Sequence, residues 1–226
     1  MLFPSFYVSC IQGLKIQIQN LSFKTIQLDK NFFIQNIKLE DSHARLEPLE
    51  EKHYGQLQDI ALSDPAIWAF TLANITDEKS FRNYFDTALR EKENGQSYPF
   101  AMFDKKENRY AGCTRYANIS FKDKRLEIGW TWIDPILQGS GLNRHNKFLM
   151  LQYGFETLAL NRIELKTAGT NLKSQRAMEK IGAQREGVLR KHSINDKGVV
   201  RDTVYYSFIK EEWPEIKAGI FKDMLY

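Results

Sequence analysis

The stretch that decides the fold is WTWIDPILQGSGLN, residues 130–143. An aromatic, apolar segment ends at Asp134-Pro135, glycines follow at positions 139 and 141, and a helical pattern begins directly behind them. Glycine lets backbone amides turn toward a ligand without a side chain in the way. The free amides at a helix start favour an anion such as a phosphate. The stretch lacks the ending of a Walker loop and the third glycine of a dinucleotide fingerprint. On the glycines alone, it is either a phosphate-binding turn or an ordinary strand–helix turn.

Strands and helices alternate on both sides of this turn, as hydrophobic periodicity and turn residues indicate. The expected elements are strand segments at 37–39 and 44–46, helices at 51–62 and 76–95, strands at 98–104, 110–119 and 126–134, a helix at 142–158, a strand at 161–167, a helix at 174–181, and strands at 184–194 and 199–209. This order predicts a mixed α/β architecture in one domain.

The composition excludes several classes of protein. Of the 226 residues, 42% are hydrophobic, which is enough for a sizeable core, and no apolar run is long enough to span a membrane. The formal net charge of +4 is too small to indicate a dedicated nucleic-acid binder. Two cysteines, Cys10 and Cys113, are too few for a disulfide framework or a cysteine-based zinc site, so we expect a cytoplasmic protein. The four histidines show no metal-binding spacing in the sequence, and we expect no metal.

Residues 1–35 differ from the rest because they carry only four formal charges, at Lys15, Lys24, Asp29 and Lys30. A targeting peptide is one interpretation, although no basic residue precedes the apolar stretch. The alternation over 14–18 is typical of a strand. We favour an N-terminal extension, or a start codon assigned too early, in front of the domain.

Several blocks of sequence resemble the GNAT N-acetyltransferase superfamily. Gln138-x-x-Gly141-x-Asn143 is similar to its acetyl-CoA pyrophosphate loop, although that family usually has Gly or Ala where this chain has Asn143. Further blocks, in the same order, resemble the branch that acetylates the N-termini of ribosomal proteins: EIGW at 127–130, NRIEL at 161–165, Asn171-x-x-Ser174, EKIGA at 179–183, RD at 201–202 and WP at 213–214. The resemblance spans residues 36–215, which leaves 1–35 as an extension and 216–226 as a tail.

The resemblance implies a single-domain GNAT fold, with a central mixed, mostly antiparallel sheet flanked by helices and one splayed pair of strands. It implies acetyl-CoA as the co-substrate, with its pantetheine arm between the splayed strands. A backbone amide near Trp132 or Ile133 would polarise the thioester carbonyl. The cofactor-binding residues that it implies are Trp132, Ile133, Gln138, Gly139, Ser140, Gly141, Leu142, Asn143 and Asn171.

The catalytic candidates are Glu127 and Ser174. The resemblance implies that Glu127 acts as the base for the acceptor amine, through a water; the alternative is a surface or salt-bridged glutamate beside Lys124 and Arg125. Ser174 would protonate or stabilise the leaving CoA thiolate, and the alternative is a helix N-cap. Asn171 either bonds the cofactor or closes the turn.

The acceptor is the least determined part of the prediction. We expect direct attack of a primary amine in a ternary complex, with a protein N-terminus as one acceptor and a small-molecule amine as the other. A non-catalytic acyl-CoA-binding module is a further alternative, although both catalytic candidates are present. We expect no nucleic-acid or membrane partner, and whether two chains form a homodimer stays open.

A few weaker candidates have two interpretations each. Cys113 is interpreted as a buried residue rather than a nucleophile. The aromatic residues Trp68, Phe70, Trp130 and Trp132 either line an acceptor pocket or belong to the core. Arg144 and His145 either contact the 3′-phosphate of CoA or lie on the solvated surface. Arg190-Lys191-His192 and Lys197 either contact an acidic substrate or lie on the solvated surface.

Overall fold

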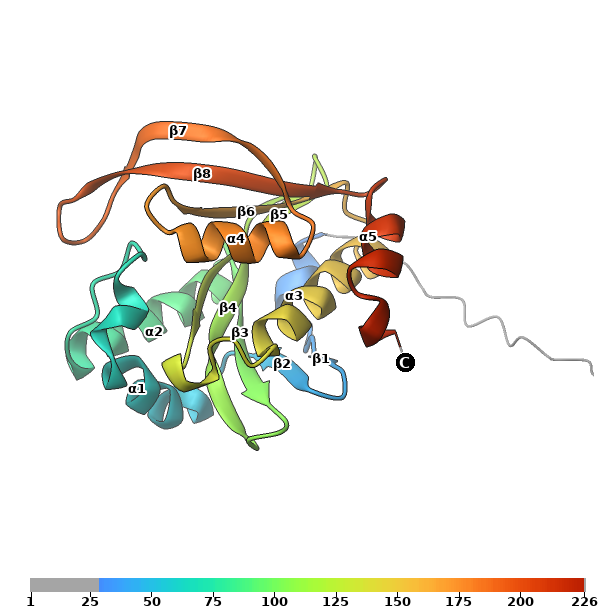
Figure 1. Cartoon of the computed structure of the whole chain (residues 1–226). Helices are drawn as coiled ribbons and strands as arrows, with labels where there is room; N and C mark the ends of the chain where they lie inside the picture. Colours follow the sequence, from blue (N-terminus) through green and yellow to red (C-terminus); the bar gives the residue numbers. More distant parts are fainter. Residues whose placement is uncertain (1–28, 226) are drawn as a thin grey trace, which may run out of the picture.

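A computed structural model describes residues 29–225 and places an eight-stranded sheet at the centre of the molecule (Figure 1). The strand order is β1-β2-β3-β4-β5-β6-β8-β7. Strands β5 and β6 run parallel, and the other neighbouring pairs are antiparallel. The predicted mixed, mostly antiparallel sheet is therefore confirmed.

The elements follow the predicted order. The strands are β1 Leu39–Glu40, β2 Ala44–Pro48, β3 Tyr98–Asp104, β4 Arg109–Ser120, β5 Arg125–Ile133, β6 Arg162–Ala168, β7 Gln184–Ile194 and β8 Val200–Ile209. The α-helices are α1 Tyr54–Ser63, α2 Glu78–Glu93, α3 Leu142–Gln152, α4 Leu172–Lys180 and α5 Trp213–Gly219. Short helical turns are η1 Lys30–Ile34, η2 Glu51–His53, η3 Pro65–Trp68, η4 Pro135–Leu137 and η6 Lys222–Met224, and the π-helical turn η5 Tyr153–Thr157 continues α3.

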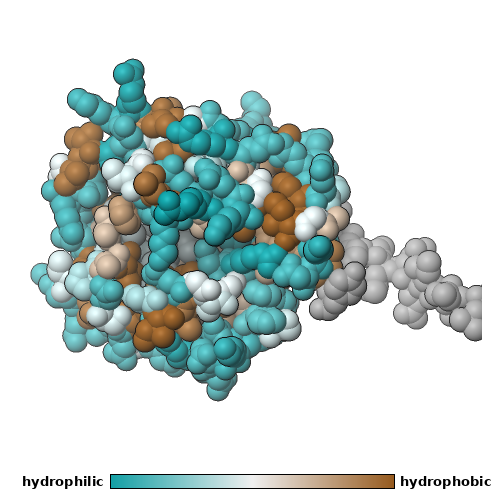
Figure 2. Space-filling model, viewed as in Figure 1, coloured by the Kyte–Doolittle hydropathy of each residue, from teal (hydrophilic) through white to brown (hydrophobic). Residues whose placement is uncertain are grey.

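Helices cover both faces of the sheet, and each face has its own apolar core. Helices α1 and α2 pack on one face through side chains such as Leu57 and Phe81. Helices α3, α4 and α5 contribute side chains such as Phe148 and Trp213 to a larger core on the other face. In the view of Figure 2 the surface is mainly hydrophilic, with apolar side chains in separate patches. No helix in residues 29–225 is long and apolar enough to cross a membrane.

The sequence signals for the ends of α2 are confirmed. Asp77 is the N-cap, and its carboxylate accepts a hydrogen bond from the Ser80 amide at 2.8 Å. The Ser80 hydroxyl in turn accepts a hydrogen bond from the Asp77 amide at 3.0 Å, which satisfies a second free amide at the helix start. Gly95 follows the helix at φ +70°, the left-handed conformation that commonly ends a helix.

The packed part of the chain extends beyond 36–215 at both ends. Phe32 and Phe33 of η1 are buried, and the Phe32 ring lies 5.1 Å from that of Tyr98. Phe221, which follows α5, is fully buried against Phe148. These aromatic side chains belong to the core on the α3 face. The strand expected at 14–18 and the question of a targeting peptide lie outside the described residues.

Candidate functional site

The parallel strands β5 and β6 pair over a short register and then separate. Their register runs from Arg125 opposite Arg162 to Glu127 opposite Glu164. Beyond it, β5 continues to Ile133 paired with β4, and β6 continues paired with β8. Within residues 29–225, the edge of β5 that faces β6 has no ladder partner past Glu127. Such an edge can hydrogen-bond an extended ligand through its backbone. The splayed pair that the resemblance implies is present.

A β-bulge interrupts β5 beside this gap. Gly129 lies opposite Arg115 and Trp132 lies opposite Cys113, so β5 has one residue more than β4 between these pairs. Trp130 accommodates the extra residue at φ +49°, a conformation that is rare outside glycine. Residues directly opposite each other on neighbouring strands point to the same face. Gly129 and Trp132 therefore both point to the α1/α2 face of the sheet.

Glu127 points to the same α1/α2 face and is anchored through one carboxylate oxygen. Its side chain is 7% exposed. Oε2 accepts hydrogen bonds from Asn118 Nδ2 at 2.6 Å and from Lys166 Nζ at 2.7 Å. No hydrogen bond to Oε1 is found within residues 29–225, and a side chain on Gly129 would approach Oε1 to 3.1 Å. Glu127 is thus buried and ion-paired with a residue of β6, and its other oxygen faces the space that Gly129 leaves open.

The loop between β5 and α3 is open and has two left-handed glycines. Gly139 and Gly141 have φ values of +88° and +96°, and no atom lies within 4 Å of the position of a Cβ on either one. Gly141 is the N-cap of α3, and the Ser140 hydroxyl accepts a hydrogen bond from the Leu142 amide at 3.3 Å. The next amide, that of Asn143, has no hydrogen-bond partner among the described residues and lies at the helix end where an anion is favoured. The buried Asn143 Oδ1 has no hydrogen-bond partner among the described residues.

The loop is tied to the neighbouring element α4. Gln138 accepts a hydrogen bond from Lys173 of α4, and its amide nitrogen lies 3.5 Å from the Ile133 carbonyl. Gln138 thus connects the turn after β5 with the start of α4 across the gap between the splayed strands. This geometry fits a phosphate-bearing ligand, because the open amides, the glycines and the unpaired strand edge adjoin one another.

The start of α4 differs from the expectation for Ser174. The N-cap is Asn171, whose Oδ1 accepts a hydrogen bond from the Ser174 amide at 3.0 Å, and the helix begins at Leu172. The alternative role of Ser174 as the N-cap is therefore wrong, because the helix already starts at Leu172 and Ser174 is its third residue. Ser174 is half-buried, and no hydrogen bond to its hydroxyl is found within the described range.

Sequence reasoning missed Lys147, a buried amine on the opposite side of β5. Lys147 lies in α3 and is 7% exposed. Its Nζ donates a hydrogen bond to Thr131 Oγ1 at 2.9 Å, and Thr131 Oγ1 lies 2.8 Å from Thr114 Oγ1. Burial lowers the pKa of Lys147 to about 7, against a smaller opposing effect of the Glu127 charge. The signal in the sequence was a lysine directly before Phe148 on the buried side of the helix.

A surface depression of about 620 Å³ lies beside Glu127. Asn118 and Lys166, the two partners of Glu127, line it, together with Arg125, Glu164, His192 and other residues of β4 and β8. Arg125 lies 3.7 Å from Glu164, so cations and anions alternate around the opening.

The weaker candidates divide into core and surface residues. Trp68 and Trp132 are buried against each other, with ring centroids 5.3 Å apart, whereas Phe70 and Trp130 are exposed. Cys113 is buried, and burial raises the pKa of its thiol to about 12, as expected for a structural cysteine.

The two candidates for a 3′-phosphate contact each have a protein partner. Arg144 pairs with Asp223 at 2.7 Å beyond α5. His145 Nδ1 bonds Asp41 at 2.7 Å. The basic residues Arg190, Lys191, His192 and Lys197 are exposed on the β7–β8 hairpin.

Comparison with known proteins places this geometry in a family. The acetyltransferase (GNAT) domain matches residues 43–184. The "Putative ribosomal N-acetyltransferase YdaF" of Bacillus subtilis (strain 168) is 35% identical over 102 residues, which cover 45% of this chain and 55% of that protein. The chain thus matches about half the length of this curated relative.

Solved structures match over more of the chain. The structure of a "putative acetyltransferase from T. thermophilus" has a TM-score of 0.74 and 34% identity, covering 84% of this chain and 97% of the other. A GCN5-related N-acetyltransferase from Brucella melitensis has a TM-score of 0.76 and 26% identity, covering 83% and 85% of the two chains.

Proposed function

This chain belongs to the acetyltransferase (GNAT) family, and we propose that it transfers an acetyl group from acetyl-CoA to a primary amine. We propose direct attack of the amine on the thioester in a ternary complex. The observation that carries the proposal is the splay of β5 from β6 past Glu127, directly beside the open loop at the start of α3. The family match and the solved relatives support it.

The proposed co-substrate site combines the strand edge with the loop. The loop formed by Gln138, Gly139, Ser140, Gly141, Leu142 and Asn143 would hold the pyrophosphate. The amides of Gly139, Gly141 and Asn143 have no hydrogen-bond partner among the described residues, whereas those of Gln138, Ser140 and Leu142 donate to protein oxygens. The open β5 edge would pair with the pantetheine arm. Acetyl-CoA would supply the activated acetyl group. A backbone amide at Trp132 or Ile133 would donate a hydrogen bond to the thioester oxygen as negative charge develops there.

Glu127 is the proposed base for the acceptor amine. Asn118 and Lys166 hold its Oε2, which leaves Oε1 to accept a proton through a water in the gap beside Gly129. Ser174, whose hydroxyl lies near the start of α4, would donate a hydrogen bond to the departing thiolate. Asn171 would act indirectly, because its side chain caps α4 and orders the helix start that carries Ser174.

A protein N-terminus is the acceptor that we propose. The relative YdaF carries the description "Putative ribosomal N-acetyltransferase", which supports a protein acceptor. The depression beside Glu127 is wide and open to solvent, so it can admit the end of a polypeptide. A small-molecule amine would use the same opening and is the alternative that the experiment must separate.

Binding of the co-substrate is tested by calorimetry with acetyl-CoA. We expect saturable binding to the wild-type protein and at least tenfold weaker binding to Ser140→Asp, because the new carboxylate repels the pyrophosphate. Ser63→Asp, at the exposed end of α1, is the matched control and should bind like the wild type. Absence of binding to the wild-type protein would refute the co-substrate assignment.

Catalysis is tested with a set of peptides and small amines, read out by release of free CoA thiol. Glu127→Gln should lower kcat about 10²–10⁴-fold at pH 7, with partial recovery as the pH rises and the amine loses its proton unaided. Glu164→Gln, the neighbour of Glu127 across the register, should keep the wild-type pH profile. An unchanged profile for Glu127→Gln would contradict its role as the base. Binding without thiol release for every acceptor would favour a non-catalytic module.

A further inference from the structure

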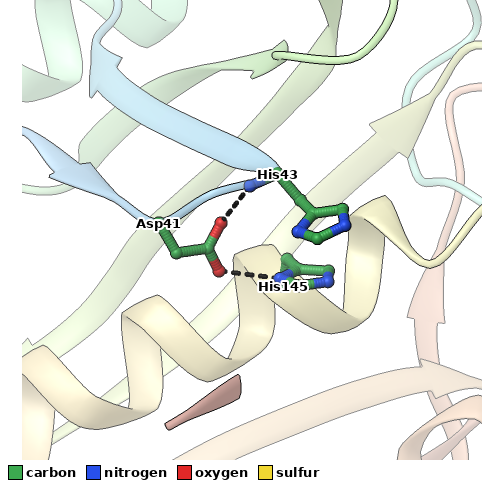
Figure 3. A group of neighbouring side chains, drawn as sticks. All are labelled: Asp41, His43 and His145. Atoms are coloured by element: carbon green, nitrogen blue, oxygen red, sulfur yellow. Dashed lines mark hydrogen bonds and ion pairs between the residues drawn. The ribbon is translucent and has the colours of Figure 1, made fainter. Parts of the chain in front are cut away.

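Two histidines that lie far apart in the sequence stack on each other beside a carboxylate. His43 follows Asp41 in the turn between β1 and β2, and His145 lies in the first turns of α3, 145 − 43 = 102 residues later (Figure 3). The two imidazole rings have centroids 4.3 Å apart and planes inclined by 19°. Each of the three residues offers one potential ligand atom, a ring nitrogen or a carboxylate oxygen, and these three atoms lie within 4.8 Å of one another. The spacing of the histidines in the sequence indicated no metal site, and the fold is what brings these side chains together.

Asp41 orients this cluster through both of its carboxylate oxygens. Oδ1 accepts hydrogen bonds from the amides of His43 and Ala44, each at 2.8 Å. Oδ2 lies 2.7 Å from Nδ1 of His145. When Nδ1 of His145 carries the proton and donates a hydrogen bond to this carboxylate, the lone pair of the neutral ring lies on Nε2. A carboxylate that bonds one ring nitrogen and leaves the other free is the usual support for a metal-binding histidine.

His43 has a matching arrangement. Its Nδ1 lies 2.8 Å from the hydroxyl oxygen of Ser42. If Nδ1 carries the proton and donates a hydrogen bond to that hydroxyl, Nε2 of His43 also keeps its lone pair. No hydrogen bond to Nε2 of either ring is found within residues 29–225. Figure 3 shows the two rings stacked one above the other, with the Asp41 carboxylate on the side of the His145 nitrogen to which it bonds.

We propose that His43 and His145 bind a borderline divalent cation such as Zn²⁺ through their Nε2 atoms, with Asp41 as the orienting carboxylate and water in the remaining positions. Imidazole nitrogens select Zn²⁺, Ni²⁺ or Cu²⁺ over Mg²⁺ and Ca²⁺, which prefer oxygen ligands. A tetrahedral zinc with Zn–N bonds of about 2.0–2.1 Å needs the two nitrogens about 3.3 Å apart. His43 is exposed and sits in a turn, so rotation of its ring can bring Nε2 to that distance.

The local charges are compatible with a cation at this position. Asp41 supplies one negative charge to the cluster. Nearby, Glu40 pairs with Lys105 at 3.1 Å and with Lys38 at 3.2 Å, so these three groups together carry one positive charge, which the negative charge of Asp41 balances. The start of α3 opposes a cation through its helix dipole, an effect smaller than that of two zinc–imidazole bonds. The ion would connect the β1–β2 turn to α3, and we therefore expect it to stabilise the fold independently of acetyl transfer.

The test is calorimetry with ZnCl2 as the probe. The parent protein is the full chain with Cys10→Ser, a substitution that removes a thiol able to bind zinc. We expect one zinc per chain. His43→Ala should weaken binding at least tenfold, and Asp41→Asn should weaken it about 10–100-fold, as expected for a supporting carboxylate. His192→Ala, which removes an exposed histidine on β7, is the matched control and should bind like the parent. Affinity should fall with falling pH, because metal ligands must be deprotonated to bind.

A second measurement reports the ligand atoms. Long-range ¹H–¹⁵N spectra of the imidazoles should show zinc-dependent shifts at Nε2 of His43 and His145, with little change for His192. Zinc should also raise the thermal midpoint of the parent protein and leave that of His43→Ala unchanged. The proposal is overturned if the parent binds no zinc saturably, or if His43→Ala binds it within twofold of the parent.

Discussion

Replacing Lys147 by methionine should make the protein more stable at pH 7 and should change how its stability depends on pH. Lys147 is buried in α3, and its pKa falls from the ordinary value of 10.5 to about 7 because burial disfavours its charged form. Methionine has a similar length and no charge to desolvate. Thr131 loses the hydrogen bond from Lys147 but keeps its neighbour Thr114 Oγ1 at 2.8 Å.

The sign of the pH effect follows from proton linkage. Between pH 7 and pH 10.5 the unfolded chain carries a proton on Lys147 that the folded protein lacks. Unfolding therefore takes up a proton, and stability rises with pH by up to about 1.4 kcal/mol per unit from this residue. Because the folded state is half-protonated at pH 7, the rise from pH 7 to pH 9 is about 2 kcal/mol. Lys147→Met should lack this contribution.

The assay is urea unfolding of both proteins at pH 7, 8 and 9, followed by circular dichroism. The difference in unfolding free energy between wild type and Lys147→Met, measured in the same buffers, cancels the other titrating groups. That difference should shift by about 2 kcal/mol in favour of the wild type from pH 7 to pH 9. Lys122→Met, an exposed lysine in the β4–β5 turn, is the control and should show a constant difference. A constant difference for Lys147→Met as well would refute the burial argument.

Two further substitutions test the packing that positions the site. A Cβ on Gly112, which has φ +145°, would lie 2.1 Å from the Trp132 carbonyl oxygen, so Gly112→Ala should destabilise the protein by about 3 kcal/mol or more. Gly55→Ala in α1 has open space around the new methyl and should be neutral or stabilising; equal unfolding free energies for the two variants would contradict the steric argument. Phe221→Ala should cost about 3–5 kcal/mol in urea unfolding, because this ring is fully buried behind α5; a loss below about 1 kcal/mol would show that the C-terminal segment contributes little to the core.

Much of the fold was predictable because its signals are local. The cap at Asp77 and the glycine that follows α2 act on amides a few residues away, and both ends lie where the sequence indicated. The sequence also predicted the aromatic strand, the glycine-bearing loop that follows it and the next helix in direct succession. At α4 the local signal was ambiguous, since Asn171 and Ser174 are both good caps, and the structure selects Asn171.

The candidate site was predictable only in part, because its partners come from separate strands and helices. The sequence indicated Glu127, but the residues that hold its carboxylate, Asn118 and Lys166, are brought to it by β4 and β6. The face to which Trp132 points depends on the extra residue at Trp130, which shifts the alternation of β5 by one position. A period-two pattern read along the strand alone assigns these side chains to the wrong faces.

The sequence by itself determined the order of strands and helices, the glycine loop that leads into α3 and the family to which the chain belongs. Tertiary structure decided which polar groups became buried and which met: Lys147 against Thr131, Glu127 against Lys166, and His43 against His145. The physical reason is range. Periodicity and capping depend on neighbours within a few residues, whereas desolvation and pairing depend on elements that are distant in sequence and adjoin only in the folded protein.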